Sequence, residues 1–176
     1  MNIHPTFTNI RSYSSDQFSA LRKHARQDLL LAKLTGRKTS LAVFPEDAPE
    51  KSPNRRYVGV YEIPVKEIIG TLNRRNDFDH QFRPLHKSLQ DRWVHAHLSL
   101  QVEGWEPILV HKVEENYYVE DGHHRVSVAR SLGLAFIQAR VWEYPCVEKG
   151  TKDCTPNMIS ERSSLKGFAP VTEEGC

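Results

Sequence analysis

Cysteine is scarce in this sequence, and its placement argues against two common uses of the residue. The 176 residues contain three cysteines, Cys146, Cys154 and Cys176, which lie late in the chain and form no C-x-x-C pair. A disulfide framework needs paired cysteines, and a structural zinc site needs closely spaced Cys or His ligands. We therefore expect a reduced, cytoplasmic protein without a cysteine-based zinc site.

Long apolar runs and a large excess of one charge are also missing. No stretch approaches the ~20 apolar residues of a membrane span, and the first residues lack a basic segment followed by an apolar one. The 24 Lys and Arg residues against 22 Asp and Glu residues leave a net charge of +2, which does not by itself indicate nucleic acid. With 39% hydrophobic residues, the chain has the composition of one folded domain with tails, and we expect no membrane partner.

An amphipathic helix is predicted near the N-terminus, over residues 14–34. Ser14, followed three residues later by Gln17, has the form of a capping box that begins a helix. Apolar residues then recur at three- and four-residue spacing and form one stripe: Phe18, Leu21, Ala25, Leu29 and Ala32. We expect this stripe to dock on the core. The basic side of the helix is either a solvated face or a surface for nucleic acid or another acidic partner.

The remaining elements predict an α+β domain over residues 57–145. Predicted strands cover 57–63, 107–113, 117–120 and 136–144, predicted helices cover 85–100 and 124–132, and 65–70 fits a turn of helix or a short strand. Residues 1–56 would hold the N-terminal helix and a proline-rich linker, and residues 146–176 a loosely held polar tail.

The segment 119–125, Val-Glu-Asp-Gly-His-His-Arg, contains the most informative group of polar residues. A strand ends there, a glycine allows a tight turn, and a helix begins within a few residues. Helix N-termini present unpaired N–H groups and a partial positive charge, so they suit phosphate. Arg125 adds a guanidinium, and Asp121 could hold a metal ion or orient a neighbouring histidine. The alternative is that Asp121 only caps the helix.

The loop 71–84 carries two further candidates. Asp77 and Asp79 are two residues apart, so in an extended loop their carboxylates face the same way. Beside a phosphate site they could bind Mg²⁺ through the nucleotide, or one of them could act as a general base. The alternative is an Asx-turn that holds the shape of the loop.

From Tyr61 to Tyr144, the sequence resembles the domain shared by ParB partition proteins, sulfiredoxins and archaeal ADP-dependent free serine kinases. Several features match in order: Ile-Pro-Val-Lys-Glu-Ile (63–68), Asn73-Arg74-Arg75, the helix 85–100, Gly104 to Val110, and the strand, turn and helix from Tyr117 to Gly133. The resemblance implies a small mixed sheet with packed helices, here preceded by an extra N-terminal amphipathic helix.

The resemblance also implies a phosphate site for a nucleotide at Gly122, His123, His124 and Arg125. In ParB these positions hold Gly-Glu-Arg-Arg and in sulfiredoxin Gly-Cys-His-Arg. The form Asp-Gly-His-His-Arg is closest to the free serine kinases. Arg74 and Arg75 would approach the phosphates from the loop. From their residue type and position beside this site, we expect Asp79 and Asp121 to be the metal ligands.

Departures from these families narrow the expected function. His123 stands where sulfiredoxins need their nucleophilic cysteine, so we expect no sulfiredoxin activity. A ParB-type DNA clamp is not expected either, because about 30 mostly polar residues follow Tyr144. The free serine kinases use a carboxylate of the early loop as a base, a role that the resemblance gives to Asp77 or Asp79.

Three functional hypotheses follow. The first is a ParB-like nucleotide-binding protein that takes ATP, ADP or CTP, with Mg²⁺. The second is a small kinase or NTPase. It would transfer a phosphoryl group, to a small-molecule acceptor in the case of a kinase, by positioning the reactants and neutralising their charge. The third, ranked last, is a DNA-associated regulatory module that uses the basic helix, whose binding would weaken steeply with salt.

Overall fold

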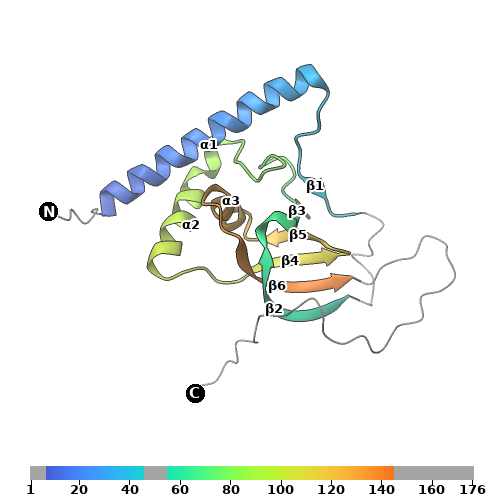
Figure 1. The fold of residues 1–176 in the computed structure, drawn as a ribbon. Coiled ribbons are helices and arrows are strands. Elements are labelled where there is room, and N and C mark those ends of the chain that lie inside the picture. Colours follow the sequence, from blue (N-terminus) through green and yellow to red (C-terminus); the bar gives the residue numbers. More distant parts are fainter. Residues whose placement is uncertain (1–6, 46–54, 145–176) are drawn as a thin grey trace.

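The fold is organised around a mixed β-sheet that carries its helices on one face. A computed structural model describes residues 7–45 and 55–144 (Figure 1). The helices and 3-10 turns are α1 (Phe7–Thr35), η1 (Val65–Glu67), η2 (Lys87–Leu89), α2 (Gln90–Val102) and α3 (His123–Ser131). The strands are β1 (Ala42–Val43), β2 (Arg56–Pro64), β3 (Ile68–Thr71), β4 (Ile108–Val113), β5 (Asn116–Asp121) and β6 (Phe136–Tyr144).

Within the described residues, the strands form one sheet in the order β1-β3-β5-β4-β6-β2. The pairs β1–β3, β3–β5 and β4–β6 are parallel, whereas β4–β5 and β2–β6 are antiparallel. The predicted α+β class with a mixed sheet is therefore confirmed. β2 lies at one edge of the sheet, which suits the proline at its last position because an edge strand tolerates a missing donor.

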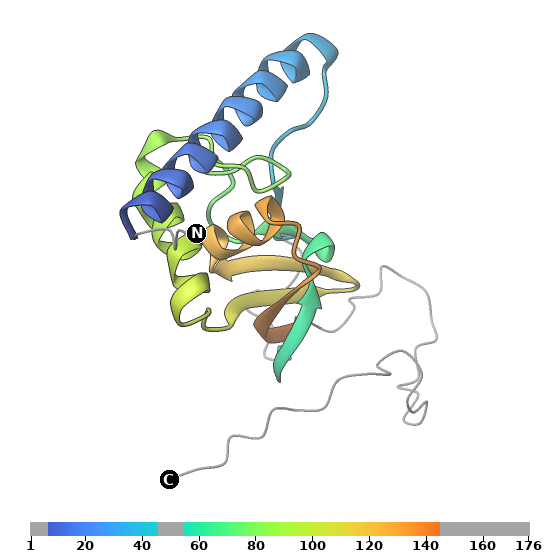
Figure 2. The same ribbon diagram turned by 60° about the vertical axis from the view of Figure 1, so that its left-hand side comes forward.

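Alternation along the strands separates the two faces of the sheet. On β6, Ile137, Ala139 and Val141 are buried while the residues between them are exposed or half-buried. Together with Ile108 and Val110 of β4 they meet the apolar sides of α2 and α3, and α1 lies across α2 on the side away from the sheet (Figures 1 and 2). This layer forms the main core.

The N-terminal helix docks as expected, but it begins earlier than the predicted Ser14. Ser14 lies inside α1 rather than at its start, and its hydroxyl donates to the carbonyl of Ile10, 2.7 Å away. The predicted capping box is therefore wrong, because α1 begins at Phe7 and Ser14 does not stand at a helix start. Ser14 is instead fully buried, and its hydroxyl lies 2.8 Å from Nδ1 of His97 on α2, within hydrogen-bonding distance. Phe18, also fully buried, packs against Trp93 of α2 with a centroid distance of 5.9 Å.

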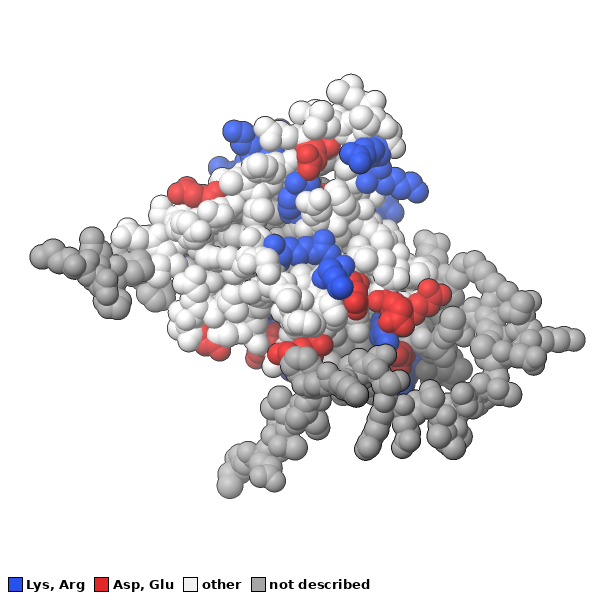
Figure 3. Space-filling model, viewed as in Figure 1, with Lys and Arg blue, Asp and Glu red and all other residues white. Residues whose placement is uncertain are grey.

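The outward side of α1 is basic. Lys23, Arg26 and Lys33 are exposed, and Lys and Arg side chains gather over the upper part of the molecule, where α1 lies (Figure 3). Leu34, near the end of the helix, is 84% exposed. Ala25 and Ala32, on the inward side of the same half of the helix, are buried.

Most predicted elements lie within a few residues of their expected limits. Residues 65–70 form both expected alternatives, the turn η1 and the first part of strand β3, while β1 had no sequence signal. Most of the proline-rich linker lies outside the described residues. The polar tail, with its three cysteines, lies entirely outside them. No helix among those that are described is long and apolar enough to cross a membrane.

Candidate functional site

The turn between β5 and α3 requires a glycine. Gly122 precedes the first turn of α3 and has a φ of 100°, in the left-handed region that glycine adopts without strain. A Cβ at this position would also collide with the side chain of Ile108 on β4. The first N–H groups of a helix have no intrahelical partner, and here they lie directly after the turn, next to the side chains of His123, His124 and Arg125.

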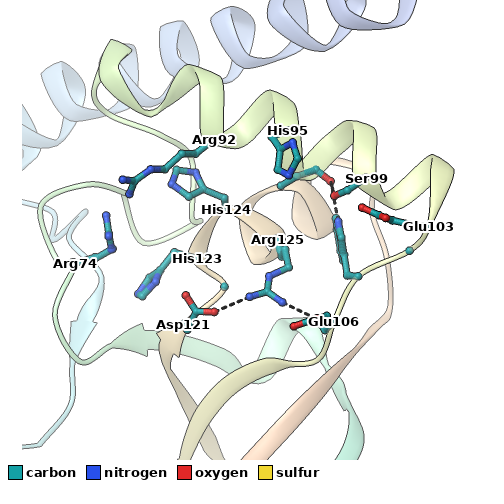
Figure 4. A pocket seen from close by; sticks show the side chains of 14 residues that line it. Arg74, Arg92, His95, Ser99, Glu103, Glu106, Asp121, His123, His124 and Arg125 are labelled. Atoms are coloured by element: carbon teal, nitrogen blue, oxygen red, sulfur yellow. Dashed lines mark hydrogen bonds and ion pairs between the residues drawn. The ribbon is translucent and has the colours of Figure 1, made fainter. Parts of the chain in front are cut away.

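A cavity of about 670 Å³ opens at this end of α3 (Figure 4). Its walls come from the loop after β3, from α2 and the segment after it, and from the β5–α3 turn. The lining residues are Arg74, Arg92, His95, Ala96, Ser99, Glu103, Gly104, Trp105, Glu106, Asp121, Gly122, His123, His124 and Arg125. Six of the predicted site residues thus share one cavity: Arg74, Asp121, Gly122, His123, His124 and Arg125.

His123 is a neutral histidine whose tautomer is determined by Thr71. The hydroxyl oxygen of Thr71 accepts the backbone N–H groups of Asn73 and Arg74, at 3.2 and 3.0 Å. Thr71 therefore donates its own O–H to Nε2 of His123, 2.7 Å away, which leaves the ring proton on Nδ1. Burial, with Arg74 nearby, lowers the pKa of His123 to about 4. The ring stacks on Phe78 and is firmly positioned.

His124 differs from His123 because neither of its ring nitrogens has a partner. Both Nδ1 and Nε2 are buried and form no hydrogen bond with any described residue. The ring lies edge-on to Phe78, with centroids 5.4 Å apart. Burial, together with the charges of Arg74 and Arg92, lowers the pKa of His124 to about 4. A buried polar group without a partner costs free energy, and a hydrogen-bonding ligand at this end of the cavity would relieve that cost.

Arg125 is held in place by two contacts. Its Nη1 donates to the carbonyl of Glu106 at 2.5 Å, and its Nη2 donates to Oδ2 of Asp121 at 2.6 Å. Asp121 is 74% exposed, whereas the side chain of Arg125 is only 20% exposed. The predicted pair of site residues is thus joined by an ion pair, and Arg125 ties the turn to the segment that precedes β4.

The loop carboxylate Asp77 lies beside the cavity but does not line it. It pairs with Arg74, which does line the cavity, at 2.9 Å, and its side chain is 29% exposed. Arg75, the next residue along, is exposed and is not among the residues that line the cavity. The two neighbouring arginines therefore have different surroundings, although the sequence analysis expected both of them to approach the phosphates.

Asp79 lies apart from the other site candidates. It is 1% exposed and accepts hydrogen bonds from the backbone N–H groups of Gln81 and Arg83, at 3.0 and 2.8 Å, and from Nε of Arg83 at 2.7 Å. Nη2 of Arg83 also pairs with Asp28 of α1 at 2.6 Å. The contact to Gln81 is the Asx-turn that the sequence allowed as an alternative. Both carboxylate oxygens of Asp79 are engaged, and the structure brings them neither to the cavity nor to Asp121.

The α2 wall of the cavity was not found from the sequence. Arg92, His95, Ser99 and Glu103 recur at spacings of three or four residues, so they form one polar side of the helix. Figure 4 shows Arg92 next to His124 and Arg74 at one end, with Ser99 and Glu103 at the other. The spacing was visible in the sequence, but only the position of α3 decides that this side faces a cavity.

The charges that line the cavity are balanced but unevenly distributed. Arg74 and Arg92 lie at the end where His124 is found, whereas Glu103 and Glu106 lie at the opposite end (Figure 4). No group of three or more His, Cys, Asp or Glu side chains within residues 7–45 and 55–144 could hold a metal ion. The cavity therefore has a cationic end and an acidic end, and its described residues do not form a metal centre by themselves.

Fold and cavity together define a small α+β domain with a polar cavity at a strand–glycine–helix turn. The chain belongs to the ParB N-terminal domain family, whose model matches residues 49–151, as the sequence motifs indicated. Among solved structures, sulfiredoxin from Arabidopsis thaliana is similar, with 26% identity and a TM-score of 0.36, over 47% of this chain and 82% of that protein. A comparison with curated proteins found no match.

Proposed function

We propose that this ParB-like domain binds a nucleotide, with the phosphates at the cationic end of the cavity. The observation that carries the proposal is His124, whose two buried ring nitrogens, beside the N-terminus of α3, have no partner in the part of the chain that the structure describes. A phosphate oxygen would accept the ring N–H and, with it, unpaired backbone N–H groups of the helix. Such a ligand would supply hydrogen bonds that no described residue supplies.

The surrounding charges support the same assignment. Arg92 is exposed and forms no ion pair with any described residue, so its charge is available to a ligand. Among the described residues, Arg74 forms an ion pair only with Asp77, and a guanidinium can hold phosphate and carboxylate together. Arg125 is already engaged by Asp121 and Glu106, and we assign it the positioning of the turn.

The opposite end of the cavity would take the rest of the nucleotide. A volume of about 670 Å³ lies within the ~300–1,000 Å³ typical of small-molecule sites. Ser99 and Glu103 offer a hydroxyl and a carboxylate there, beside the half-buried ring of Trp105. Asp121, which lines the cavity, would hold a divalent cation, and this cation would neutralise phosphate charge.

The test is a calorimetric and thermal-shift panel of ATP, ADP, CTP and GTP, each with and without Mg²⁺. We expect one nucleotide to bind, and His124→Ala and Arg92→Ala to weaken its binding by ten-fold or more. Arg74→Ala and Arg75→Ala form a matched pair of neighbours, of which only Arg74 lines the cavity. Absence of binding for every nucleotide, or equal effects of the two arginine substitutions, would contradict the proposal.

Phosphoryl transfer is a second candidate, for which Asp77 is the favouring observation. Its half-buried carboxylate lies 2.9 Å from the guanidinium of Arg74, next to the proposed phosphate end. A carboxylate there could accept the proton of an attacking hydroxyl or water. Release of phosphate, or a phosphorylated acceptor, that disappears in Asp77→Asn while nucleotide binding persists would support transfer. If the native chain binds a nucleotide without turning it over, phosphoryl transfer is excluded and nucleotide binding is the function that is supported.

The basic side of α1 is the observation that keeps DNA association as a third candidate. Removing the helix is a poor test, because Phe18 packs on Trp93 and truncation would uncover the core. Reversing the charge of Lys23, Arg26 and Lys33, which are exposed, leaves that contact intact. If α1 binds DNA, the triple Glu variant loses binding and the salt dependence becomes shallower. Unchanged DNA binding would exclude this role for α1.

A further inference from the structure

A second cavity, of about 860 Å³, lies at the C-terminal end of α3, away from the β5–α3 turn. Its walls come from α1, the η1 turn, the loop after β3, and α3 with the segment that follows it. The lining residues are Leu21, Pro64, Val65, Lys66, Glu67, Gln81, Arg83, Ser127, Arg130, Ser131, Gly133, Leu134, Ala135 and Phe136. It shares no lining residue with the first cavity.

Arg130 is the unusual residue of this second cavity. Its guanidinium donates to three backbone carbonyls, those of His80, Val65 and Ile68, at 3.3, 3.4 and 2.5 Å. It also lies over the ring of Phe82, 5.0 Å from the centroid. The Nε–H is buried and has no acceptor among the described residues. Arg130 is therefore well held but not fully hydrogen-bonded.

The charge of Arg130 is not matched by a carboxylate. No described Asp or Glu forms an ion pair with it, and burial lowers the pKa of Arg130, against a weaker opposing effect of Asp79. Arg83, the other arginine of the cavity, is neutralised by Asp79 and Asp28. A buried cation without a counter-ion is costly, and an anionic group in the cavity would supply both the missing charge and the missing acceptor.

Besides the two arginines, the lining includes the oppositely charged Lys66 and Glu67 and the polar Gln81, Ser127 and Ser131, and its other residues are apolar. The apolar lining residues include Leu21 of α1, Leu134, and the neighbours Val65 and Ala135, whose backbones are joined by a hydrogen bond of 3.0 Å. The carbonyls at the end of α3 do not oppose an anion strongly, because those of Val128, Ala129 and Arg130 already accept N–H groups of the following turn. An apolar body and a single anionic head thus match the two parts of the cavity.

We propose that this second cavity binds a small organic acid, with its carboxylate at the guanidinium of Arg130 and its apolar body against Leu21, Val65 and Leu134. The site is independent of the nucleotide site, because the two cavities lie at opposite ends of α3. A carboxylate suits this cavity because the carboxylate provides a negative charge and an accepting oxygen. The apolar lining residues favour a ligand with a hydrocarbon chain or ring over a bare anion.

Two tryptophans report on the two cavities separately. The indole N–H of Trp93 donates to Ser127, which lines the second cavity, at 2.9 Å, whereas Trp105 lines the first. In the ¹⁵N-labelled full chain, we titrate octanoate and, as the uncharged analogue, octanol. We expect octanoate to shift the Trp93 indole signal, to leave that of Trp105 unmoved, and to bind at least five-fold more tightly than octanol. Equal binding of the two, or a shift confined to Trp105, would overturn the proposal.

A substitution pair tests the same site with the same ligand. Arg130→Gln is the direct variant, but Arg130 also ties three backbone carbonyls, so loss of binding there could reflect misfolding. Ser131→Glu places a carboxylate in the cavity lining at an exposed position, and Leu132→Glu adds the same charge one residue later, outside the lining. We expect octanoate binding to fall five-fold or more in Ser131→Glu and to be unchanged in Leu132→Glu. Equal affinities of the two variants would refute the assignment.

Discussion

The loop between β3 and η2 depends on one buried carboxylate, and Asp79→Asn tests that dependence. The side chain of Asp79 is 2% exposed and accepts three N–H groups from Gln81 and Arg83. Asparagine keeps one oxygen, so the two backbone contacts can persist. Its amide group, however, presents a donor to the guanidinium of Arg83 where an acceptor is needed, and the ion pair is lost.

The expected cost follows from the burial of this pair. Removing one partner of a buried ion pair destabilises a protein by about 3–5 kcal/mol. Arg83 retains Asp28 as a partner at 2.6 Å, so we expect the lower end, about 3 kcal/mol. Asp77→Asn is the matched control from the same loop. Asp77 is 29% exposed, and exposed ion pairs contribute about 0–1 kcal/mol.

Urea unfolding of the full chain at neutral pH, followed by circular dichroism, measures both free energies of unfolding. We expect the two variants to differ by about 2 kcal/mol or more, with similar m-values. Equal stabilities, or a larger loss for Asp77→Asn, would refute the structural role of Asp79. If Asp79→Asn instead abolished a measured phosphoryl transfer without a loss of stability, the role as a base or metal ligand expected from sequence would be right.

Three more predictions concern the turn and its histidines. Because burial lowers the pKa values of His123 and His124 to about 4, below the 6.5 of an unfolded histidine, the unfolded state binds more protons between pH 6.5 and 4. The free energy of unfolding should therefore fall with decreasing pH in that window, by up to ~1.4 kcal/mol per unit per histidine; a flat urea-unfolding profile would contradict this. Phosphate binding at His124 should raise its pKa and cause proton uptake, seen as a dependence of the calorimetric enthalpy on buffer. Gly122→Ala should destabilise by about 2 kcal/mol or more in thermal unfolding, because of its φ of 100° and the collision with Ile108. Gly133→Ala, with a φ of 67° and open space around it, should cost about 1 kcal/mol.

Local sequence signals predicted most of the fold. The alternation of Ile137, Ala139 and Val141 predicted β6, and the structure has that strand at the same limits, Phe136–Tyr144. The stripe through Phe18 and Ala25 predicted a docked helix, and both residues are fully buried. These predictions hold because the period of a helix or strand is expressed by neighbours a few residues apart.

The same local signals were weaker at the start of α1. Ser14 with Gln17 had the form of a capping box, yet Ser14 is a buried mid-helix residue that contacts His97 of α2. Its hydroxyl satisfies a contact between two helices that lie far apart in the sequence. A capping motif and a helix–helix contact use the same residue type, so composition alone could not distinguish them.

What the sequence by itself determined is the turn at Gly122 and the cluster of His123, His124 and Arg125 behind it, because adjacent residues at the start of a helix lie together in any fold that contains that helix. Only the tertiary structure decided that Arg92 joins this cluster and that Asp79 does not. Those outcomes depend on how α2 and the loop after β3 meet α3, and such contacts arise from burial of the shared core rather than from spacing along the chain.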